Sequence, residues 1–245
     1  MSEIRHWTRE EVCLVLDLYC KLPYGKMNHT TPEIIKLANF LGRTPSAISM
    51  RLCNFASLDP TIEQKGMSNV AKLDKEIWNE FFHNEDMIDA VEKQAEEIYS
   101  TKTDTEIDNT KNYFADDTVA TVKVRRLQRF FRKSIIASYD SKCCVTGIAH
   151  PAFLVASHIV PWTDDKQNRL NPHNGLCLNV MHDKAFDKGF MTLDTDFRIV
   201  FSNELPRTSE FDFLLKYEGK RISMPKKFFP SQSFLEYHRN KIFRG

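Results

Sequence analysis

The chain has 245 residues, of which 42% are apolar and 27% charged, and its formal net charge is +1. This length allows one large domain or two ordinary ones, and the composition is that of a folded globular protein. No run reaches the roughly 18 apolar residues of a membrane helix, and the first residues lack the pattern of a signal peptide. We therefore expect a cytoplasmic protein with no membrane partner, whose six cysteines are free thiols.

The small net charge conceals an uneven distribution along the chain. Residues 1–84 contain ten basic and ten acidic side chains, residues 85–118 contain three and eleven, and residues 119–245 contain 21 and 12. A basic C-terminal half suits a partner with a phosphate backbone, because binding to nucleic acid is largely electrostatic. Taken alone this is weak support, since many globular domains carry a similar excess.

The first 60 residues are predicted to form helices. Thr8 is a candidate N-cap in front of two acidic residues, and apolar residues then recur at helical spacing. A second helix is predicted from Pro32 to Leu41 and is ended by Gly42, and a third begins after Thr44. The turn between the last two is only a few residues long, which makes this pair a helix-turn-helix candidate.

The segment from Trp7 to Phe55 resembles a Myb/SANT-type three-helix domain in its W-T-x-E-E opening and its L-G-R-T turn. In such domains the last helix enters the major groove of DNA. The resemblance implies that Arg43, Ser46 and Arg51 face DNA. The alternative is a supporting helical domain, and the modest basic charge of the third helix leaves that alternative open.

Residues 73–99 predict one or two further helices, which would complete a helical domain over residues 1–99. Residues 100–118 are polar, acidic and short of apolar periodicity, as is typical of a linker. The domain boundary is therefore predicted there, and residues 119–245 form the second domain, with a basic leading helix and a C-terminal tail.

The leading helix of the second domain is predicted over residues 122–139, which are basic and amphipathic. Lys123, Arg126 and Arg129 lie around its polar side. One interpretation places this side along the backbone of a DNA duplex, and the other treats it as the solvated face of a helix that packs on a core.

Residues 154–162 alternate apolar side chains with β-branched enrichment, which predicts a strand that ends at Pro161. A turn cluster follows at residues 171–175, and then a second short strand at residues 176–178. Asn179 can cap a helix that carries His182 and is closed by Gly189. The order strand, loop, strand, helix predicts a ββα unit around a polar centre, and an α+β class for the chain.

The pattern C-x-x-G, S-H-I-V-P-W, N-P-x-N-G-L-C-L and H-D-x-x-F-D-x-G resembles the HNH endonucleases, in the branch found in restriction-type and other defence nucleases. The resemblance covers roughly residues 120–205. It implies the ββα-metal fold, and it implies that His158, Asn174 and His182 are the three catalytic residues.

The role of each of these residues in phosphodiester cleavage can be explained by its chemistry. A histidine with a near-neutral pKa can take a proton from water, so His158 is the candidate general base. His182 is the best single metal ligand, and Asp187 either adds a carboxylate ligand or orients His182. In the family the central asparagine, here Asn174, ties the loop that carries the base. With one imidazole and Ser157 where many relatives place a ligand, we expect Mg²⁺ or Mn²⁺ rather than Zn²⁺.

The cysteines near the motif offer at most three ligands for a structural zinc, at Cys143, Cys144 and Cys177. Because Cys144 is followed at the third position by Gly147 and the sequence has no C-x-x-C pair, buried thiols are the expected interpretation.

We therefore expect a metal-dependent endonuclease that hydrolyses phosphodiester bonds of double-stranded DNA. The family branch implies a restriction or defence role, with a site or modification preference set by the N-terminal domain. Direct readout of a palindromic site would imply a homodimer. The alternatives are a non-catalytic DNA-binding regulator and an RNA-specific or structure-specific nuclease.

Overall fold

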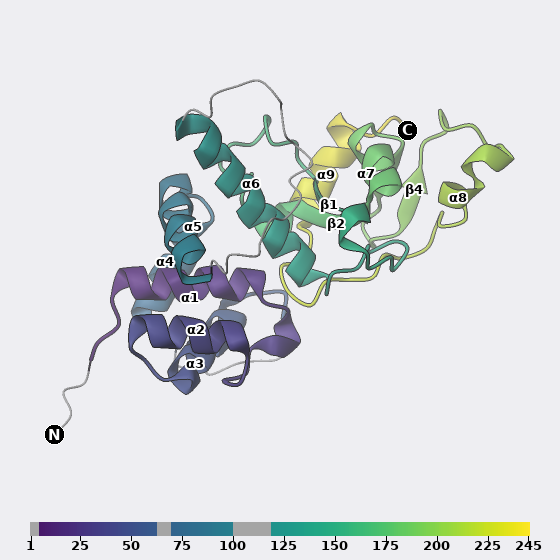
Figure 1. Cartoon of the computed structure of the whole chain (residues 1–245). Helices are drawn as coiled ribbons and strands as arrows, with labels where there is room; N and C mark the ends of the chain where they lie inside the picture. The colour runs from purple at the N-terminus through teal and green to yellow at the C-terminus, as the bar shows by residue number, and fades with distance from the viewer. Residues whose placement is uncertain (1–4, 63–69, 100–118) are drawn as a thin grey trace. The chain divides into compact units, whose positions relative to one another are not determined.

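The computed structural model describes residues 5–62, 70–99 and 119–245 (Figure 1). The chain divides into two compact units, Met1–Phe130 and Phe131–Gly245, and the division falls inside helix α6 (Val119–Ser138). The boundary predicted at residues 100–118 lies outside the described residues. The first turns of α6 belong to the helical unit because their basic side chains pair with carboxylates of helix α5 (Glu85–Tyr99).

The first unit is built around one buried helix, α1 (Arg9–Lys21), which contacts the four helices that follow it. All of its residues from Glu11 to Cys20 are buried, as expected for a helix surrounded by others. The surrounding helices are α2 (Pro32–Leu41), α3 (Pro45–Leu58), α4 (Lys72–Phe81) and α5, and a short 3-10 turn spans Tyr24–Lys26.

The ends of these helices follow the predicted signals. The Thr8 side chain accepts a hydrogen bond from the backbone N–H of Glu11, whose own side chain accepts from the N–H of Thr8. Helix α2 ends at Gly42, whose φ of +61° is the left-handed conformation that glycine adopts without strain. Thr44 then caps α3. The three predicted helices are confirmed, and so are two helices between residues 72 and 99.

The second unit has two small antiparallel sheets and short helices (Figure 1). Strand β1 (Leu154–His158) pairs with β2 (Gly175–Asn179), and helix α7 (Val180–Asp187) follows β2 directly. The remaining elements are β3 (Met191–Leu193), β4 (Ile199–Phe201), α8 (Asp212–Leu215), α9 (Gln232–Lys241) and 3-10 turns at Pro151–Phe153, Pro172–Asn174 and Ser209–Phe211.

The predicted mixture of helices and small sheets is confirmed, as is the order strand, loop, strand, helix. Strand β1 ends at His158 rather than at Pro161, because beyond it the side chain of Asn174 takes over the backbone bonds of Val160. Within the described part of the chain, no helix is both long and apolar enough to cross a membrane.

Candidate functional site

The ββα unit places two segments beside one pocket, the end of β1 and one face of α7. The register of the β1–β2 pair sets His158 opposite Gly175 and Leu154 opposite Asn179. Asn179 then caps α7, since its side-chain oxygen accepts hydrogen bonds from the backbone N–H groups of Met181 and His182. The predicted cap is confirmed.

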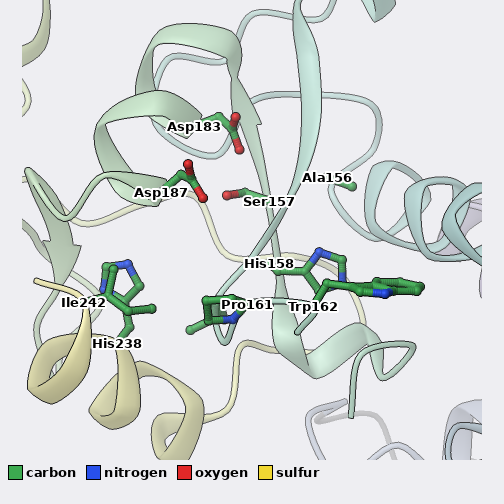
Figure 2. Close-up of a pocket in the computed structure, with 10 residues that line it drawn as sticks. Ala156, Ser157, His158, Pro161, Trp162, Asp183, Asp187, His238 and Ile242 are labelled. Atoms are coloured by element: carbon green, nitrogen blue, oxygen red, sulfur yellow. The ribbon is translucent and has the colours of Figure 1, made fainter. Parts of the chain in front are cut away.

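A pocket of about 350 Å³ lies between these segments (Figure 2). Its polar side chains are those of a serine, two aspartates and two histidines, and apolar residues from the loop after β1 and the end of α9 complete its wall. The residues that line it are Ala156, Ser157, His158, Ile159, Pro161, Trp162, Asp183, Asp187, His238 and Ile242.

His158 is held in this pocket by a single hydrogen bond through Nε2. That nitrogen lies 2.9 Å from the backbone carbonyl oxygen of Arg169. A carbonyl oxygen only accepts, so Nε2 carries the proton and Nδ1 keeps its lone pair. Burial lowers the pKa of His158 from 6.5 to about 4, and the hydrogen bond to Arg169 opposes that effect. The ring is therefore neutral at neutral pH, with Nδ1 as its proton acceptor.

Asn174 fixes the loop that follows His158. The side chain is fully buried, and its oxygen accepts from the backbone N–H of Val160 at 2.8 Å while its amide donates to the carbonyl oxygen of Val160 at 3.1 Å. The backbone carbonyl of Asn174 also accepts from the N–H of Ile159. These hydrogen bonds tie the loop after His158 to the start of β2.

Helix α7 presents two different faces. One face is buried and carries His182, Ala185 and Phe186, none of which lines the pocket. Asp183 and Asp187, four residues apart, lie on the face that does line it. The pocket face of α7 therefore carries carboxylates rather than an imidazole.

His182 differs from the expected metal ligand in its position. It is only 2% exposed, its Nδ1 lies 3.1 Å from the side-chain oxygen of Asn179, and its ring meets the edge of Tyr217. Burial, with a smaller contribution from Lys216, lowers the pKa of His182 to about 4. Its Nε2 is buried without a hydrogen-bond partner. The structure places His182 in the core and outside the lining of the pocket.

Asp183 and Asp187 form an acidic group with Ser157, and all three side chains turn toward a common space in Figure 2. Burial raises the pKa of Asp183, and the charge of Asp187 raises it further, while a hydrogen bond from Ser157 lowers it. A nearby cation would relieve this unfavourable negative charge. The oxygen donors of this group fit Mg²⁺ or Mn²⁺, which accept one or two carboxylates and complete their coordination with water and phosphate oxygens.

The described residues offer no more complete metal site than this. No group of three or more His, Cys, Asp or Glu side chains in that part of the chain is arranged to hold a metal ion. Cys143, Cys144 and Cys177 are buried free thiols, and the sulfur of Cys143 accepts a hydrogen bond from the backbone N–H of Asn179. These thiols pack as core residues, as expected.

His238 lines the pocket from α9, but both of its ring nitrogens are engaged. Nδ1 lies 2.9 Å from the hydroxyl of Thr192 and Nε2 lies 3.1 Å from the carbonyl oxygen of Phe186, on whose ring the imidazole stacks. Burial lowers its pKa to about 4. His238 therefore supports α7 through Phe186, and both of its ring nitrogens are already hydrogen-bonded.

The residues expected to read DNA from the third helix take different positions. The Arg43 guanidinium binds Glu11 at 2.7 Å, and the Arg51 guanidinium binds the fully buried Asp74. Both guanidinium groups also lie over the ring of Trp7, at 3.8 Å and 4.2 Å from its centroid. Ser46, in the first turn of α3, is exposed. The two arginines thus stabilise the helical unit, and the exposed face of α3 is not basic.

The three basic residues of α6 that were expected to contact DNA are likewise paired within the first unit. Lys123 binds Asp86 at 2.6 Å, Arg126 binds Asp89 at 2.7 Å, and Arg129 binds Glu96 at 2.7 Å, each partner lying on α5. For these side chains to contact DNA, they would have to exchange a carboxylate for a phosphate.

The geometry defines a pocket in which a neutral histidine faces an oxygen-rich acidic group, on a ββα unit. Residues 143–194 match the family model described as HNH endonuclease. This part of the second unit is therefore similar to the HNH endonucleases. No curated protein matches the chain.

Sequence reasoning selected His158 and Asn174, but it missed Asp183. The helical spacing carried this signal. Asp183 and Asp187 are four residues apart and so share one face of the helix, whereas His182 shares a face with the apolar Phe186. Trp162 was also passed over as a pocket residue, since its position depends on the course of the loop after β1.

Proposed function

We propose that this protein is a divalent-metal-dependent endonuclease that hydrolyses phosphodiester bonds of double-stranded DNA. The observation that carries the proposal is the pocket shared by neutral His158 and the carboxylates Asp183 and Asp187. A base and an anionic oxygen group are what metal-assisted hydrolysis of a phosphodiester needs. The match of residues 143–194 to the HNH endonucleases supports the same class.

In the proposed reaction, Nδ1 of His158 takes a proton from a water molecule whose oxygen forms the new bond to phosphorus. The bond from phosphorus to the 3′ oxygen breaks, and its electron pair leaves with that oxygen. Asp183 and Asp187 would hold Mg²⁺ or Mn²⁺, with Ser157 beside them. When bound, the cation supplies Lewis-acid stabilisation of the charge on the phosphate and the leaving oxygen. Asn174 keeps the loop after His158 closed.

This proposal replaces His182 by Asp183 as the principal metal ligand on α7. The reason is position, since Asp183 lines the pocket whereas His182 is buried and does not line it. Asp187 keeps its proposed place in the ligand set. His182 instead supports the N-terminal turn of α7 through its contact with Asn179.

Cleavage of a supercoiled plasmid with Mg²⁺, Mn²⁺ or EDTA tests the reaction. We expect nicking and linearisation with either cation and none with EDTA. His158→Ala and Asp183→Asn should abolish cleavage while DNA binding persists. The matched control is Asp196→Asn, since Asp196 is an exposed aspartate outside the pocket. Full activity of His158→Ala would show that the base is misassigned.

The choice between Asp183 and His182 is tested separately by titrating Mn²⁺ into the protein and measuring binding by calorimetry. Asp183→Asn should weaken Mn²⁺ binding at least tenfold, and His182→Gln should change it little in the folded protein. The opposite pattern would restore His182 as the ligand.

We further propose that the enzyme acts in restriction or defence, that the helical unit sets its site or modification preference, and that it works as a homodimer on a palindromic site. The support is the family branch that the motif resembles and the division of the chain into a helical and a nuclease unit. Cleavage of a panel of unmodified and cytosine-modified duplexes, branched DNA and RNA tests these points, with the oligomeric state measured by sedimentation. Preference for RNA or branched DNA would favour the other nuclease class, and binding without any cleavage would favour a regulator.

A further inference from the structure

The ring of His158 is clamped by aromatic side chains as well as by its hydrogen bond. The ring of Phe131, on α6, stacks on it with centroids 3.8 Å apart and planes 10° apart. Phe131 is 2% exposed, so this stack is closed to water. The imidazole therefore has one face fixed by a rigid buried ring.

A second aromatic ring, from the loop that follows β1, also contacts the imidazole. Trp162 meets His158 edge-to-face, with centroids 5.5 Å apart and planes 88° apart. The guanidinium of Arg169 lies 4.7 Å from the centroid of the Trp162 ring, and the backbone oxygen of the same arginine holds Nε2 of His158. Together these contacts leave the imidazole little freedom to rotate about its Cβ–Cγ bond.

The space that Phe131 occupies exists because residue 175 is a glycine. Gly175 pairs with His158 across the β1–β2 ladder. A Cβ atom at that position would lie 2.8 Å from Cζ of Phe131 and 2.4 Å from Cδ1 of Ile135. Real Cβ atoms do not approach so closely, so even a methyl group there would displace the ring that stacks on His158.

We propose that Phe131 is a positioning residue for His158, and that the absence of a side chain at Gly175 is what admits it to the stack. By fixing the plane of the imidazole, Phe131 keeps Nε2 on the carbonyl of Arg169 and so keeps Nδ1 as the unprotonated nitrogen. The inference deepens the proposed function and rests on it, because it concerns the same base. A misplacement of about 1 Å at a reacting group can lower a rate about 100-fold.

The helix supplies its own control for the test. Phe130 and Phe131 are adjacent, both are buried, and only Phe131 contacts His158, whereas Phe130 packs edge-to-face on Phe81. Phe131→Leu should lower kcat of plasmid cleavage at least tenfold with little change in KM. Phe130→Leu, with a similar loss of buried ring, should leave both kinetic constants within about twofold. Equal kinetic losses in the two variants would mean that Phe131 acts through folding alone.

A spectroscopic measurement separates this inference from the nuclease reaction. In metal-free protein, ¹⁵N spectra of the histidine rings report which nitrogen of His158 carries the proton, with assignment by His158→Gln. The wild type and Phe130→Leu should show the Nε2–H form, and Phe131→Leu should show a mixture of both tautomers. An unchanged Nε2–H form in Phe131→Leu would overturn the inference, even if cleavage is confirmed. An inactive wild type with the expected spectra would instead overturn the proposed function.

Substitution of Gly175 provides a second test of the same inference. Gly175→Ala should lower kcat as strongly as Phe131→Leu, because both remove the stack. In the double variant the stack can be lost only once, so the two losses should not multiply. Losses that multiply in the double variant would show that the two residues act separately.

Discussion

Acid is expected to unfold the second unit, because it buries neutral histidines. His182 and His238 are 2% and 1% exposed, and burial lowers the pKa of each ring to about 4. Each folded value lies about 2.5 below the unfolded value of 6.5, and one pKa unit corresponds to about 1.4 kcal/mol. Each ring therefore contributes about 3–4 kcal/mol to the free energy of unfolding above pH 6.5, and this contribution is lost as the pH falls toward 4.

The sign follows from proton counting. Between pH 6.5 and 4 the unfolded chain binds a proton at each histidine that the folded chain does not, so acid favours unfolding. The two rings together amount to about 7 kcal/mol, which is comparable to the whole stability of a typical domain. The raised pKa of Asp183 acts in the opposite direction, since that group favours the fold as the pH falls.

Urea unfolding from pH 7.5 to 4.5 measures the effect, followed by the fluorescence of Trp162 in a chain whose Trp7 and Trp78 are phenylalanine. His238→Gln should lose about 3 kcal/mol less than the wild type over this range. His150→Gln, at an exposed histidine, should keep the slope of the wild type. If His238→Gln and the wild type lose equal stability, the buried neutral ring is not the cause.

Three further substitutions test other parts of the structure. Asn174→Ala leaves buried backbone groups of the loop without partners and should cost about 1–3 kcal/mol in urea unfolding, with a loss of plasmid cleavage; retained cleavage would remove its loop-tying role. Arg51→Ala strands the buried carboxylate of Asp74 and should destabilise the helical unit by about 3–5 kcal/mol; a stable variant with weaker DNA binding would instead restore Arg51 as a DNA contact. Arg126→Ala breaks its pair with Asp89 and should cost up to about 1 kcal/mol with little change in DNA affinity measured by fluorescence anisotropy, and a large fall in affinity would contradict this.

The fold was predictable wherever local signals decided it. Thr8, Gly42 and Thr44 mark helix ends through their own backbone and side-chain chemistry, and the structure has helices beginning and ending there. The cap at Asn179 likewise marks the start of α7. The end of β1 was less predictable, because Asn174, distant in sequence, replaces the ladder bonds after His158.

The candidate site was predictable in type and less so in its residues. The spacing of His158, Asn174 and the helix that follows indicates the class of site, which the HNH match to residues 143–194 supports. The direction of each side chain on α7 depends on which helix face meets the core. The observed packing places Asp183 in the pocket lining and His182 in the core.

The sequence by itself predicted the order of elements, the similarity of residues 143–194 to HNH endonucleases and the candidate base, because each depends on residues close together in the chain. Only the tertiary structure decided which carboxylates join His158 and which basic residues are already paired. Arg51 and Arg126 appear in the sequence as free cations, but folding brings Asp74 and Asp89 to them from other helices. The stack of Phe131 on His158 arises in the same way, since it joins α6 to β1 beside Gly175, where a side chain would collide with the ring of Phe131.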